Sequence, residues 1–268
     1  MSTLMCASLC GNVCGMFHHS PVTNECSTFR EKSYDSGVVL SADPDWTTSY
    51  RQNHAAVEQG DWTMVFRAQK EIGVSVWDTW NNAGVHDDNP IPSDFPFACL
   101  RLADYSSCDR HFRSHILDNW VGIKEVRFSF IKENSEVAFV LFNGTDTSRD
   151  SWFSQDRILD SSWYPHLINE VTLTETGIYG HYNLQYVARR FYLFGPHNGC
   201  ADDWVYTMVI DRTNEPCLDS GNWHIPPFQS MPTFYYSPTS LGRASLRTDK
   251  AYPLAQTADV LAVHVKFA

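Results

Sequence analysis

Alternation of apolar and polar residues is the strongest signal in this chain. In VGIKEVRFSFIKENSEVAFVLFNG, residues 121–144, every second position from 126 to 130 is apolar, and a continuous apolar run follows at 137–142. A period of two is that of a half-buried strand, and the polar stretch at 132–135 is typical of a turn. The segment therefore predicts an antiparallel hairpin.

Shorter segments of the same kind follow along the chain. We expect strands at WTMVFRA (62–68) and near 151–159, 170–175, 188–194, 204–211, 232–237 and 259–267. The last strand, placed beside the first, would close a sheet. One helix is expected at 109–120, where Phe112, Ile116 and Trp120 are four residues apart. Many short strands and few helices predict a mainly β chain.

Three regions differ in character. Residues 1–45 predict a small, disulfide-stapled α+β module, and residues 46–60, which are polar and poor in branched apolar side chains, predict a linker. Residues 61–268 predict an antiparallel β-sandwich or jelly-roll-like domain with one or two short helices. Within the module, we expect a strand, a turn at Ser20–Pro21 and a return strand that ends at Cys26.

Composition and charge narrow the classes of partner. The net charge is −11, so the chain has no basic field with which to collect nucleic acid or anionic membranes. No run approaches eighteen apolar residues, so we expect no membrane span. The first residues lack the basic and apolar regions of a secretion signal. Because the cysteine content nevertheless suits secretion, we expect that the chain as given lacks its true N-terminus.

Four of the eight cysteines fall in the first 26 residues, with the spacing C-x3-C-x3-C-x11-C. Zinc sites usually show C-x2-C pairs, and none occurs here. A metal site or iron–sulfur cluster, disulfides and reduced cytosolic thiols remain as alternatives, and the even count favours disulfides. The other four cysteines form two local pairs that could clip loops, Cys99 with Cys108 and Cys200 with Cys217.

The segment CASLCGNVCGMFHHSPVTNECSTF, residues 6–29, resembles the core of a PAN/apple domain. It has a helix with C-x3-C, a further cysteine, a strand that begins Gly-Met-Phe, a turn and a closing cysteine. The resemblance covers about residues 1–50 and implies the pairs Cys6–Cys26 and Cys10–Cys14. The strand that this family places before the helix is absent, which supports a truncated start.

Two further resemblances concern the rest of the chain. DWTMVFRAQKEIGVSVWDTW, residues 61–80, is similar to the start of a fibrinogen C-terminal domain, but the glycine-rich, calcium-binding pattern of that family is absent, so its ligand pocket is not carried over. Residues 60–268 resemble uncharacterised extracellular β-domains of marine invertebrates that follow PAN-like modules. This resemblance rests on W-x-x-V-F-R, the FNGT…WF segment and ADVLAVHVK, and it implies an extracellular location but no activity.

Aromatic side chains on predicted loops are the candidate ligand contacts. Sugars stack on Trp and Tyr rings, and five such residues lie in the segments SSWYPH, DSGNWHIPPF and FYYSP. They are Trp163, Tyr164, Trp223, Tyr235 and Tyr236. The alternative is that aromatic residues at strand ends cover the core.

Carboxylates offer weaker candidates. In NGTDTSRDSW, Asp146 and Asp150 could suit calcium, although the pattern is not that of an EF-hand and a long turn is the simpler interpretation. Neighbouring residues on a strand point to opposite faces, so the carboxylates of Asp87–Asp88 and Asp202–Asp203 are not expected to act as pairs. We expect both doublets to be solvated loop charges. We expect no cofactor beyond such a calcium ion.

Two histidines and one asparagine complete the candidates. His111 and His115 are four residues apart on the expected helix, which could suit zinc, but the metalloprotease motif is absent. Asn143 begins the glycosylation sequon Asn-Gly-Thr. Nucleophile-elbow and phosphate-loop motifs are also absent.

The sequence therefore predicts a secreted, disulfide-bonded glycoprotein of lectin-like type. We expect it to bind carbohydrate or an extracellular protein through loops of the β-sandwich, without catalysis. Two alternatives remain open: an extracellular hydrolase that uses buried carboxylates, and a structural component of a matrix or egg coat.

Overall fold

The chain divides into two compact units, Met1–Glu58 and Gln59–Ala268, and each is considered by itself. In this computed structural model, the described parts are residues 16–19, 26–29, 47–50, 58–59, 61–103, 105–170, 176–178, 189–194, 200, 203–212, 217, 230–240, 242–247 and 253–268. The chain is mainly β, with antiparallel sheets and two short α-helices among these residues, which confirms the predicted fold class.

The first unit contains a three-stranded antiparallel sheet. Its strands are β1 (Met16–His19), β2 (Cys26–Phe29) and β3 (Thr47–Tyr50), in the order β2-β1-β3. The return strand begins at Cys26 and does not end there, because Thr28 and Phe29 suit a strand better than Pro21 and Asn24 do. The expected linker contributes β3, whose threonines and tyrosine also favour a strand. Cys6, Cys10 and Cys14 lie outside the described residues.

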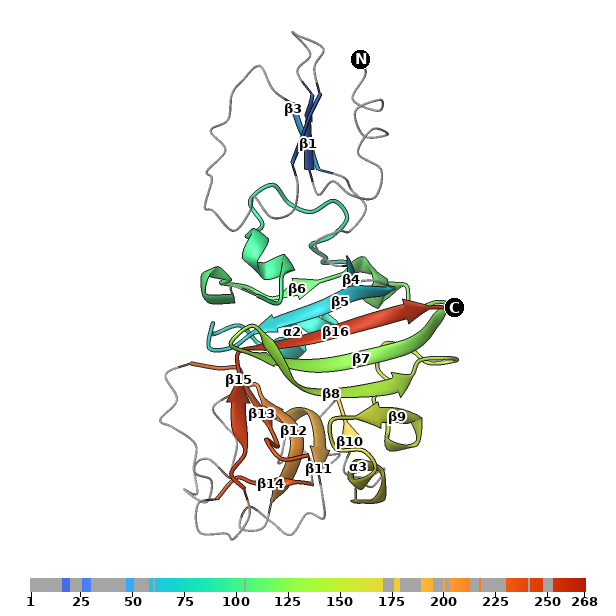
Figure 1. Ribbon diagram of the computed structural model, residues 1–268, viewed down its shortest axis with the longest axis vertical. Helices are drawn as coiled ribbons and strands as arrows, with labels where there is room; N and C mark the ends of the chain where they lie inside the picture. Colours follow the sequence, from blue (N-terminus) through green and yellow to red (C-terminus); the bar gives the residue numbers. More distant parts are fainter. Residues whose placement is uncertain are drawn as a thin grey trace. The chain divides into compact units, whose positions relative to one another are not determined.

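The larger sheet has seven strands in the order β4-β5-β16-β7-β8-β9, with β6 paired to β5 (Figure 1). Its strands are β4 (Glu58–Gln59), β5 (Trp62–Gln69), β6 (Phe112–Arg113), β7 (Ile123–Lys132), β8 (Ser135–Asn143), β9 (Ile158–Ser161) and β16 (Val260–Phe267). The C-terminal strand β16 pairs with both β5 and β7, so the predicted closure by the last strand is confirmed.

A six-stranded antiparallel sheet forms the second layer of this unit, in the order β10-β11-β12-β13-β15, with β14 paired to β12. Its strands are β10 (Thr176–Gly177), β11 (Arg189–Phe194), β12 (Trp204–Ile210), β13 (Thr233–Tyr236), β14 (Ala244–Ser245) and β15 (Gln256–Ala258). The predicted strands near 188–194, 204–211 and 232–237 are therefore present. The strand expected near 170–175 falls largely outside the described residues.

The hairpin of β7 and β8 turns through two residues. Lys132 pairs with Ser135, so Glu133 and Asn134 form the loop, with φ angles of 50° and 66°. Two successive positive φ angles define the tight turn whose twist matches that of the flanking strands. The backbone N–H of Glu133 also donates to Asp259, at 2.9 Å. The turn predicted at 132–135 is thus confirmed.

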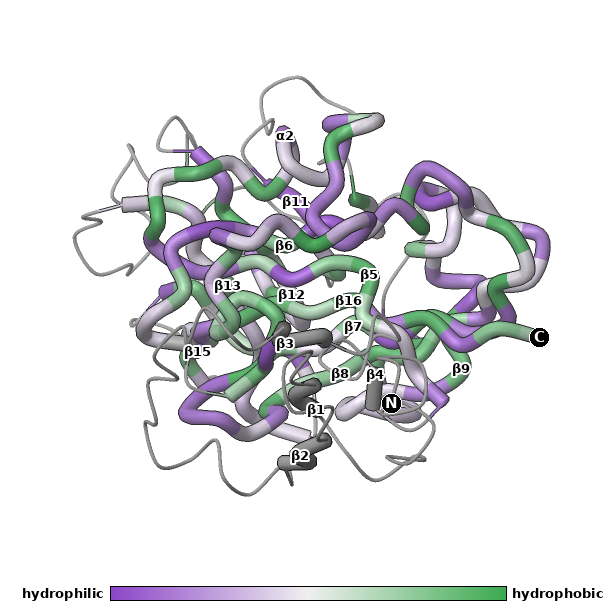
Figure 2. Tube along the Cα trace, turned by 90° about the horizontal axis from the view of Figure 1, so that it is seen from above, coloured by the Kyte–Doolittle hydropathy of each residue, from purple (hydrophilic) through white to green (hydrophobic). Residues whose placement is uncertain are grey.

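One hydrophobic core fills the space between the two large sheets. Phe130 of β7 stacks on Phe234 of β13 at 6.1 Å between ring centroids, and Phe128 stacks on Phe191 of β11 at 5.6 Å. All four side chains are fully buried, and each contributes about 1.5–3 kcal/mol by burial. Figure 2 shows the hydrophobic positions gathered in the strands of this unit.

The outward faces of both sheets are also covered. In β16, Leu261 and Val263 belong to the central core, whereas Val260 and Ala262 pack with Ile131 in a separate cluster on the opposite face. Likewise Met208, Tyr235 and Leu246 belong to a cluster on the outward face of the six-stranded sheet. Both sheets therefore bury side chains on two faces.

The prediction of a helix at 109–120 is wrong. Phe112 and Arg113 form β6 beside β5, and only a 3-10 turn, η4 (His115–Asp118), follows. The backbone N–H of Ser114 donates to Val65 of β5, at 2.9 Å, so strand pairing replaces helical hydrogen bonds at this point. The expected strand at 151–159 is also corrected, because turns and the 3-10 turn η5 (Gln155–Arg157) precede β9.

The one or two short helices predicted for this unit are present among the described residues, but at positions that the sequence did not indicate. They are α2 (Val76–Asn81) and α3 (His166–Glu170), and the remaining 3-10 turns are η2 (Phe97–Leu100) and η3 (Tyr105–Ser107). Ser75 caps α2 by accepting the N–H of Asp78 at 3.0 Å. Trp80 of α2 is fully buried and meets Phe66 and Phe191 edge to face.

Candidate functional site

Three of the five predicted ligand contacts lie in the interior. Trp163 is 1% exposed, and its Nε1–H donates to the carbonyl of Ser237 at 3.2 Å. Tyr236 is 4% exposed and belongs to the central core. Tyr235 is 2% exposed and lies on the outward face of β13. These side chains cover hydrophobic clusters, so they do not form an exposed platform for stacking.

The other two predicted contacts stand apart from these. Tyr164 is 55% exposed and follows directly after Trp163, before Pro165 and α3. Trp223 lies outside the described residues. The structure therefore does not bring the four described candidates together on one surface, and of these four only Tyr164 presents its ring to solvent.

Tyr235 nevertheless lines a pocket of about 230 Å³. We call it the Tyr235 pocket, and the residues that line it are Lys132, Tyr235, Ser245, Leu246, Leu254, Ala255, Gln256 and Thr257. It lies on the outward side of the six-stranded sheet, where Tyr235 and Leu246 pack in one cluster. The sequence predicted Tyr235 as a contact, but the rest of this lining comes from segments that carry no recognisable motif.

The hydroxyl of Tyr235 is buried, and among the described residues it has no hydrogen-bond partner. Burial raises the pKa of this phenol, and the negative charge of Glu71 raises the pKa further. The hydroxyl therefore stays protonated and can donate a hydrogen bond.

A second polar site surrounds Asp88. This carboxylate is 9% exposed and accepts hydrogen bonds from the hydroxyl of Ser114, the backbone N–H of His115 at 2.8 Å and His115 Nδ1 at 2.8 Å. The expectation of a solvated loop charge is wrong for Asp88. The carboxylate can be buried because these three donors, from Ser114 and His115, satisfy it.

The pair Asp88–His115 orients an imidazole. A carboxylate only accepts, so Nδ1 of His115 carries the proton and Nε2 is the basic nitrogen. The His115 side chain is 33% exposed, and the ring of His86 lies 6.0 Å away between centroids. Such a pair can act as a general base. The hydroxyl of Ser114 donates to Asp88, however, and among the described residues no hydroxyl or thiol is bonded to Nε2.

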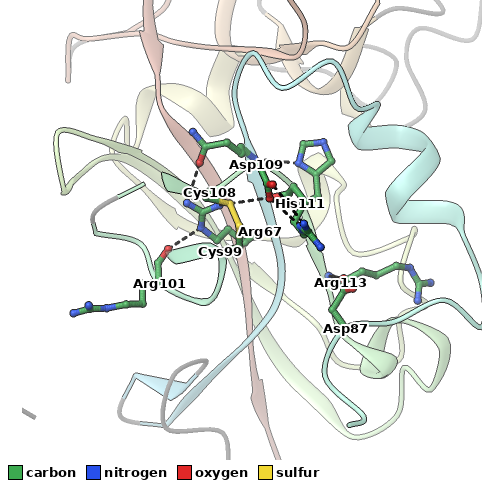
Figure 3. Close-up of a disulfide and its surroundings, with 10 residues drawn as sticks. Arg67, Asp87, Cys99, Arg101, Cys108, Asp109, His111 and Arg113 are labelled. Atoms are coloured by element: carbon green, nitrogen blue, oxygen red, sulfur yellow. Dashed lines mark hydrogen bonds and ion pairs between the residues drawn. A yellow bond between two sulfur atoms is a disulfide. The ribbon is translucent and has the colours of Figure 1, made fainter. Parts of the chain in front are cut away.

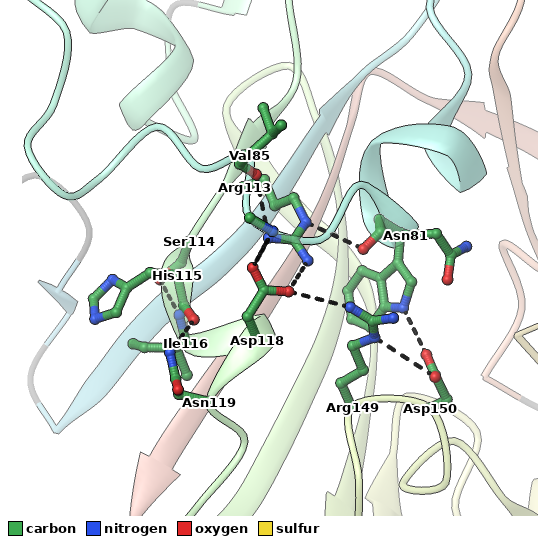
Figure 4. Close-up of polar contacts among 12 residues, drawn as sticks. Asn81, Val85, Arg113, Ser114, His115, Ile116, Asp118, Asn119, Arg149 and Asp150 are labelled. Atoms are coloured by element: carbon green, nitrogen blue, oxygen red, sulfur yellow. Dashed lines mark hydrogen bonds and ion pairs between the residues drawn. The ribbon is translucent and has the colours of Figure 1, made fainter.

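Arg113 anchors the same region, and Figure 4 shows its side chain reaching toward Asp118. Its buried guanidinium donates to the carbonyl of Trp80 at 3.2 Å and to Asp118 through Nη1 at 2.9 Å. The hydrogen bond from Arg113 lowers the pKa of Asp118 to about 2. Arg149 approaches Asp118 at 3.3 Å, and its neighbour Asp150 accepts from Nε1 of Trp80 at 2.9 Å. The network ties α2, β6 and η4 to the loop that carries Arg149 and Asp150.

The two predicted local disulfides are present. Cys99 and Cys108 are joined with a Cα–Cα distance of 4.9 Å, and Cys200 and Cys217 with one of 5.2 Å. Among the described residues each bridge has an arginine beside it. Figure 3 shows the guanidinium of Arg67 against the first bridge, where Nη1 lies 2.9 Å from Cys108 Sγ.

Arg67 is completely buried, and burial lowers its pKa to about 10. Its Nε donates to the carbonyl of Arg101 at 2.7 Å, and Nη2 donates to Gln69 at 3.0 Å. Arg67 therefore links β5 to the loop that Cys99 and Cys108 close.

The second bridge has a similar neighbour. Nη2 of Arg189 donates to Cys217 Sγ at 2.9 Å, and Nη1 pairs with Asp203 at 3.2 Å. Asp203 is 3% exposed, so the expectation of a solvated charge is wrong for this residue too. Asp202 lies outside the described residues. No local pattern in the sequence signals either arginine.

The described residues do not bring the candidate metal ligands together. His111 is buried, with Nδ1 accepting the N–H of Gln69 at 3.1 Å and Nε2 at 3.0 Å from the carbonyl of Val74, so both ring nitrogens are occupied. Asp146 is exposed, whereas Asp150 bonds Trp80. Within the described parts, no three His, Cys, Asp or Glu residues are grouped so that they could hold a metal ion.

Comparison with known proteins gives no relative. No family model, no curated protein and no solved structure matches the chain. Among the described helices, none has both the length and the hydrophobicity that crossing a bilayer requires.

Proposed function

We propose that the chain is a secreted, disulfide-stabilised binding protein that recognises carbohydrate or an extracellular protein. The observation that carries this proposal is the pair of bridges in the second unit, Cys99–Cys108 and Cys200–Cys217. Disulfides form and persist in oxidising compartments and are rare in the cytosol. Cys99, Cys108 and Cys217 are buried, as expected of structural bridges.

Two surface features support the same proposal. Asn143 is exposed at the end of β8, and its Oδ1 accepts the N–H of Thr145 at 3.0 Å, which leaves the amide nitrogen at the surface for a glycan. Tyr164 presents a ring to solvent that could stack on a sugar. Binding is favoured over the alternative hydrolase that uses buried carboxylates, because the buried carboxylates of Asp88 and Asp203 are held by protein groups, Ser114 and His115 for the first and Arg189 for the second.

Secretion and oxidation are tested together in mammalian cells with an added signal peptide. We expect the unreduced protein to give disulfide-linked peptides for both bridges, and the intact mass to fall by one N-glycan in Asn143→Gln. Asn169→Gln, which changes an amide outside any sequon, should keep the glycan. Free thiols at Cys99 or Cys200 in the folded, secreted protein would contradict the proposal.

A further inference from the structure

The two disulfides of the second unit differ in the charges around them. Nη1 of Arg67 lies 2.9 Å from Sγ of Cys108. Nη2 of Arg189 lies at the same distance from Sγ of Cys217, but Arg189 also pairs with the buried carboxylate of Asp203 at 3.2 Å. Among the described residues Arg67 pairs with no carboxylate, since its guanidinium donates to two neutral oxygens and to the sulfur.

The positive charge of Arg67 therefore lies in the interior without a counter-ion among these residues. The side chain is fully buried, and its other two hydrogen bonds go to the carbonyl of Arg101 and to Oε1 of Gln69 (Figure 3). Burial lowers the pKa of Arg67 to about 10, so the guanidinium is still charged at neutral pH. A neighbouring group that became an anion would be stabilised by this charge, because few water molecules screen the pair.

Reduction of the first bridge creates such an anion. A thiolate at Cys108 would accept a charge-assisted hydrogen bond from Arg67. The carbonyl oxygen of Arg110 lies 3.0 Å from the same sulfur and favours a protonated thiol, but its partial charge is smaller than the full charge of Arg67. The side chains of Asp109 and Arg110 pair with each other at 2.8 Å at the surface, where water and salt screen them.

Reduction of the second bridge gains less from its arginine. Sγ of Cys217 lies 3.8 Å from Oδ2 of Asp203. This carboxylate already neutralises Arg189, and it would repel a thiolate at Cys217. A disulfide whose reduced form is stabilised is the easier one to reduce. The charges therefore favour opening of the first bridge under less reducing conditions than the second.

We propose that Cys99–Cys108 is a redox-sensitive bridge, which a small thiol such as glutathione opens before Cys200–Cys217, and that Cys108 then becomes the counter-ion of Arg67. The thiolate of the reductant attacks Sγ of Cys99, and the electron pair of the S–S bond leaves on Cys108. A second thiol then releases Cys99 as a protonated thiol. The products are the disulfide of the reductant, the Cys99 thiol, the Cys108 thiolate and one proton.

The position of the bridge affects the rate of this exchange. Cys99 is 0% exposed and Cys108 is 5% exposed, so the reductant reaches the sulfur only when the loop opens locally. Ser106 and Ser107, which precede Cys108, are exposed. Burial slows the attack but does not enter the equilibrium between the oxidised and reduced forms. This inference goes beyond the proposed function, because it concerns the covalent state of the chain and needs no bound ligand.

Equilibrium with thiol buffers tests the proposal on the full chain. The protein is equilibrated at neutral pH in graded mixtures of reduced and oxidised glutathione, and then of reduced and oxidised dithiothreitol. After acid quenching and alkylation, peptide mass spectrometry gives the reduced fraction of each bridge. We expect Cys99–Cys108 to be half reduced in a buffer at least about tenfold less reducing than the buffer that Cys200–Cys217 requires, or about 30 mV for a two-electron couple.

Gln69→Glu isolates the effect of charge from the effects of loop length and burial. Oε1 of Gln69 lies 3.0 Å from Nη2 of Arg67, so a glutamate of nearly the same shape gives this arginine a resident carboxylate, as Asp203 does at the second bridge. We expect the variant to make Cys99–Cys108 about tenfold harder to reduce, because the Cys108 thiolate loses its advantage. The second bridge should not change.

Gln256→Glu is the matched control. It makes the same substitution at an exposed position of β15, in the other large sheet, and should leave the reduction of Cys99–Cys108 unchanged. A second readout needs no variant. In wild-type protein opened only at the first bridge, the ultraviolet absorbance of one thiolate should be present at about pH 6, where an ordinary cysteine is protonated.

The outcomes separate this inference from the proposed function. It is overturned if both bridges open in the same buffer, if Gln69→Glu leaves the first bridge unchanged, or if the opened protein has no thiolate at about pH 6. Loss of near-ultraviolet circular dichroism in step with reduction would also overturn it, because the bridge would then open only by unfolding. Two bridges that resist reduction equally would leave the proposed function standing, whereas free thiols in the folded, secreted protein would overturn that function.

Discussion

At the scale of single residues, two histidines are buried in a neutral form. His111 accepts the N–H of Gln69 at Nδ1, so its proton sits on Nε2 and is donated to the carbonyl of Val74. His264 of β16 lies beside Arg127 of β7 and is 6% exposed. Burial is the main cause that lowers the pKa of each to about 4.

Stability should therefore fall on mild acidification. In the unfolded chain a histidine has a pKa near 6.5, so between pH 6.5 and about 4 the unfolded state binds protons that the folded state does not. The free energy of unfolding should decrease as the pH falls through this window, by a few kcal/mol for the two residues together.

Urea unfolding between pH 4 and 7 measures this dependence. His111→Gln retains a donor and an acceptor but cannot titrate, so it should remove about half of the slope, and adding His264→Gln should remove most of the rest. An unchanged slope in the double variant would show that other groups control the acid response.

At the scale of elements, contacts distant in the sequence decide what short segments become. The six-residue helix α2 begins at Val76, and its N-terminus is held by Asp211, which directly follows β12. Asp211 accepts the N–H of Val76 at 2.6 Å, the N–H of Trp77 at 3.0 Å and the hydroxyl of Ser75 at 2.7 Å. A helix this short has little stability of its own, so the remote carboxylate and the burial of Trp80 maintain it.

Asp211→Ala should therefore cost about 2–3 kcal/mol of unfolding free energy, because it leaves two helical N–H groups without their acceptor. Asp78→Ala is the matched control. Asp78 lies in the same helix, and its pair with Arg212 at 3.2 Å is exposed, so its loss should cost no more than about 1 kcal/mol. Chemical denaturation of both variants compares the two costs, and equal values would contradict the assigned role.

At the scale of the whole second unit, the two bridges lie on different outward faces of the sandwich. Cys108 contacts Arg67 of β5 in the seven-stranded sheet, whereas Cys217 belongs to the cluster on the outward face of the six-stranded sheet. Each bridge closes a loop, with sequence separations of 9 and 17 residues. Because they lie on different faces of the sandwich, we expect their effects on stability to add.

The double variants Cys99→Ala/Cys108→Ala and Cys200→Ala/Cys217→Ala should each lose about 3 kcal/mol by the loop-entropy relation. Combining all four substitutions should lose nearly the sum. Thermal and urea unfolding of the three proteins measures these losses. A loss in the combined protein that is no larger than in either double variant would show that the two bridges stabilise the same local structure.

The sequence alone determined the features that depend on neighbouring residues. The alternation in β7 and β8, the turn at Glu133–Asn134 and the apolar run of β16 predict strands because side-chain period and turn chemistry are local. The pairs Cys99–Cys108 and Cys200–Cys217 could be predicted for the same reason, since each joins residues close in sequence.

The tertiary structure alone decided which side chains are buried, that Asp211 holds the N-terminus of α2, and which residues surround Asp88. The four-residue spacing at 109–120 indicated a helix, but pairing with β5 and the partners of Asp88 and Arg113 made it a strand and a 3-10 turn. Tyr235 could have been a surface platform or a core residue. Its burial follows from the packing of β13 against loops far away in the sequence, which no local pattern encodes.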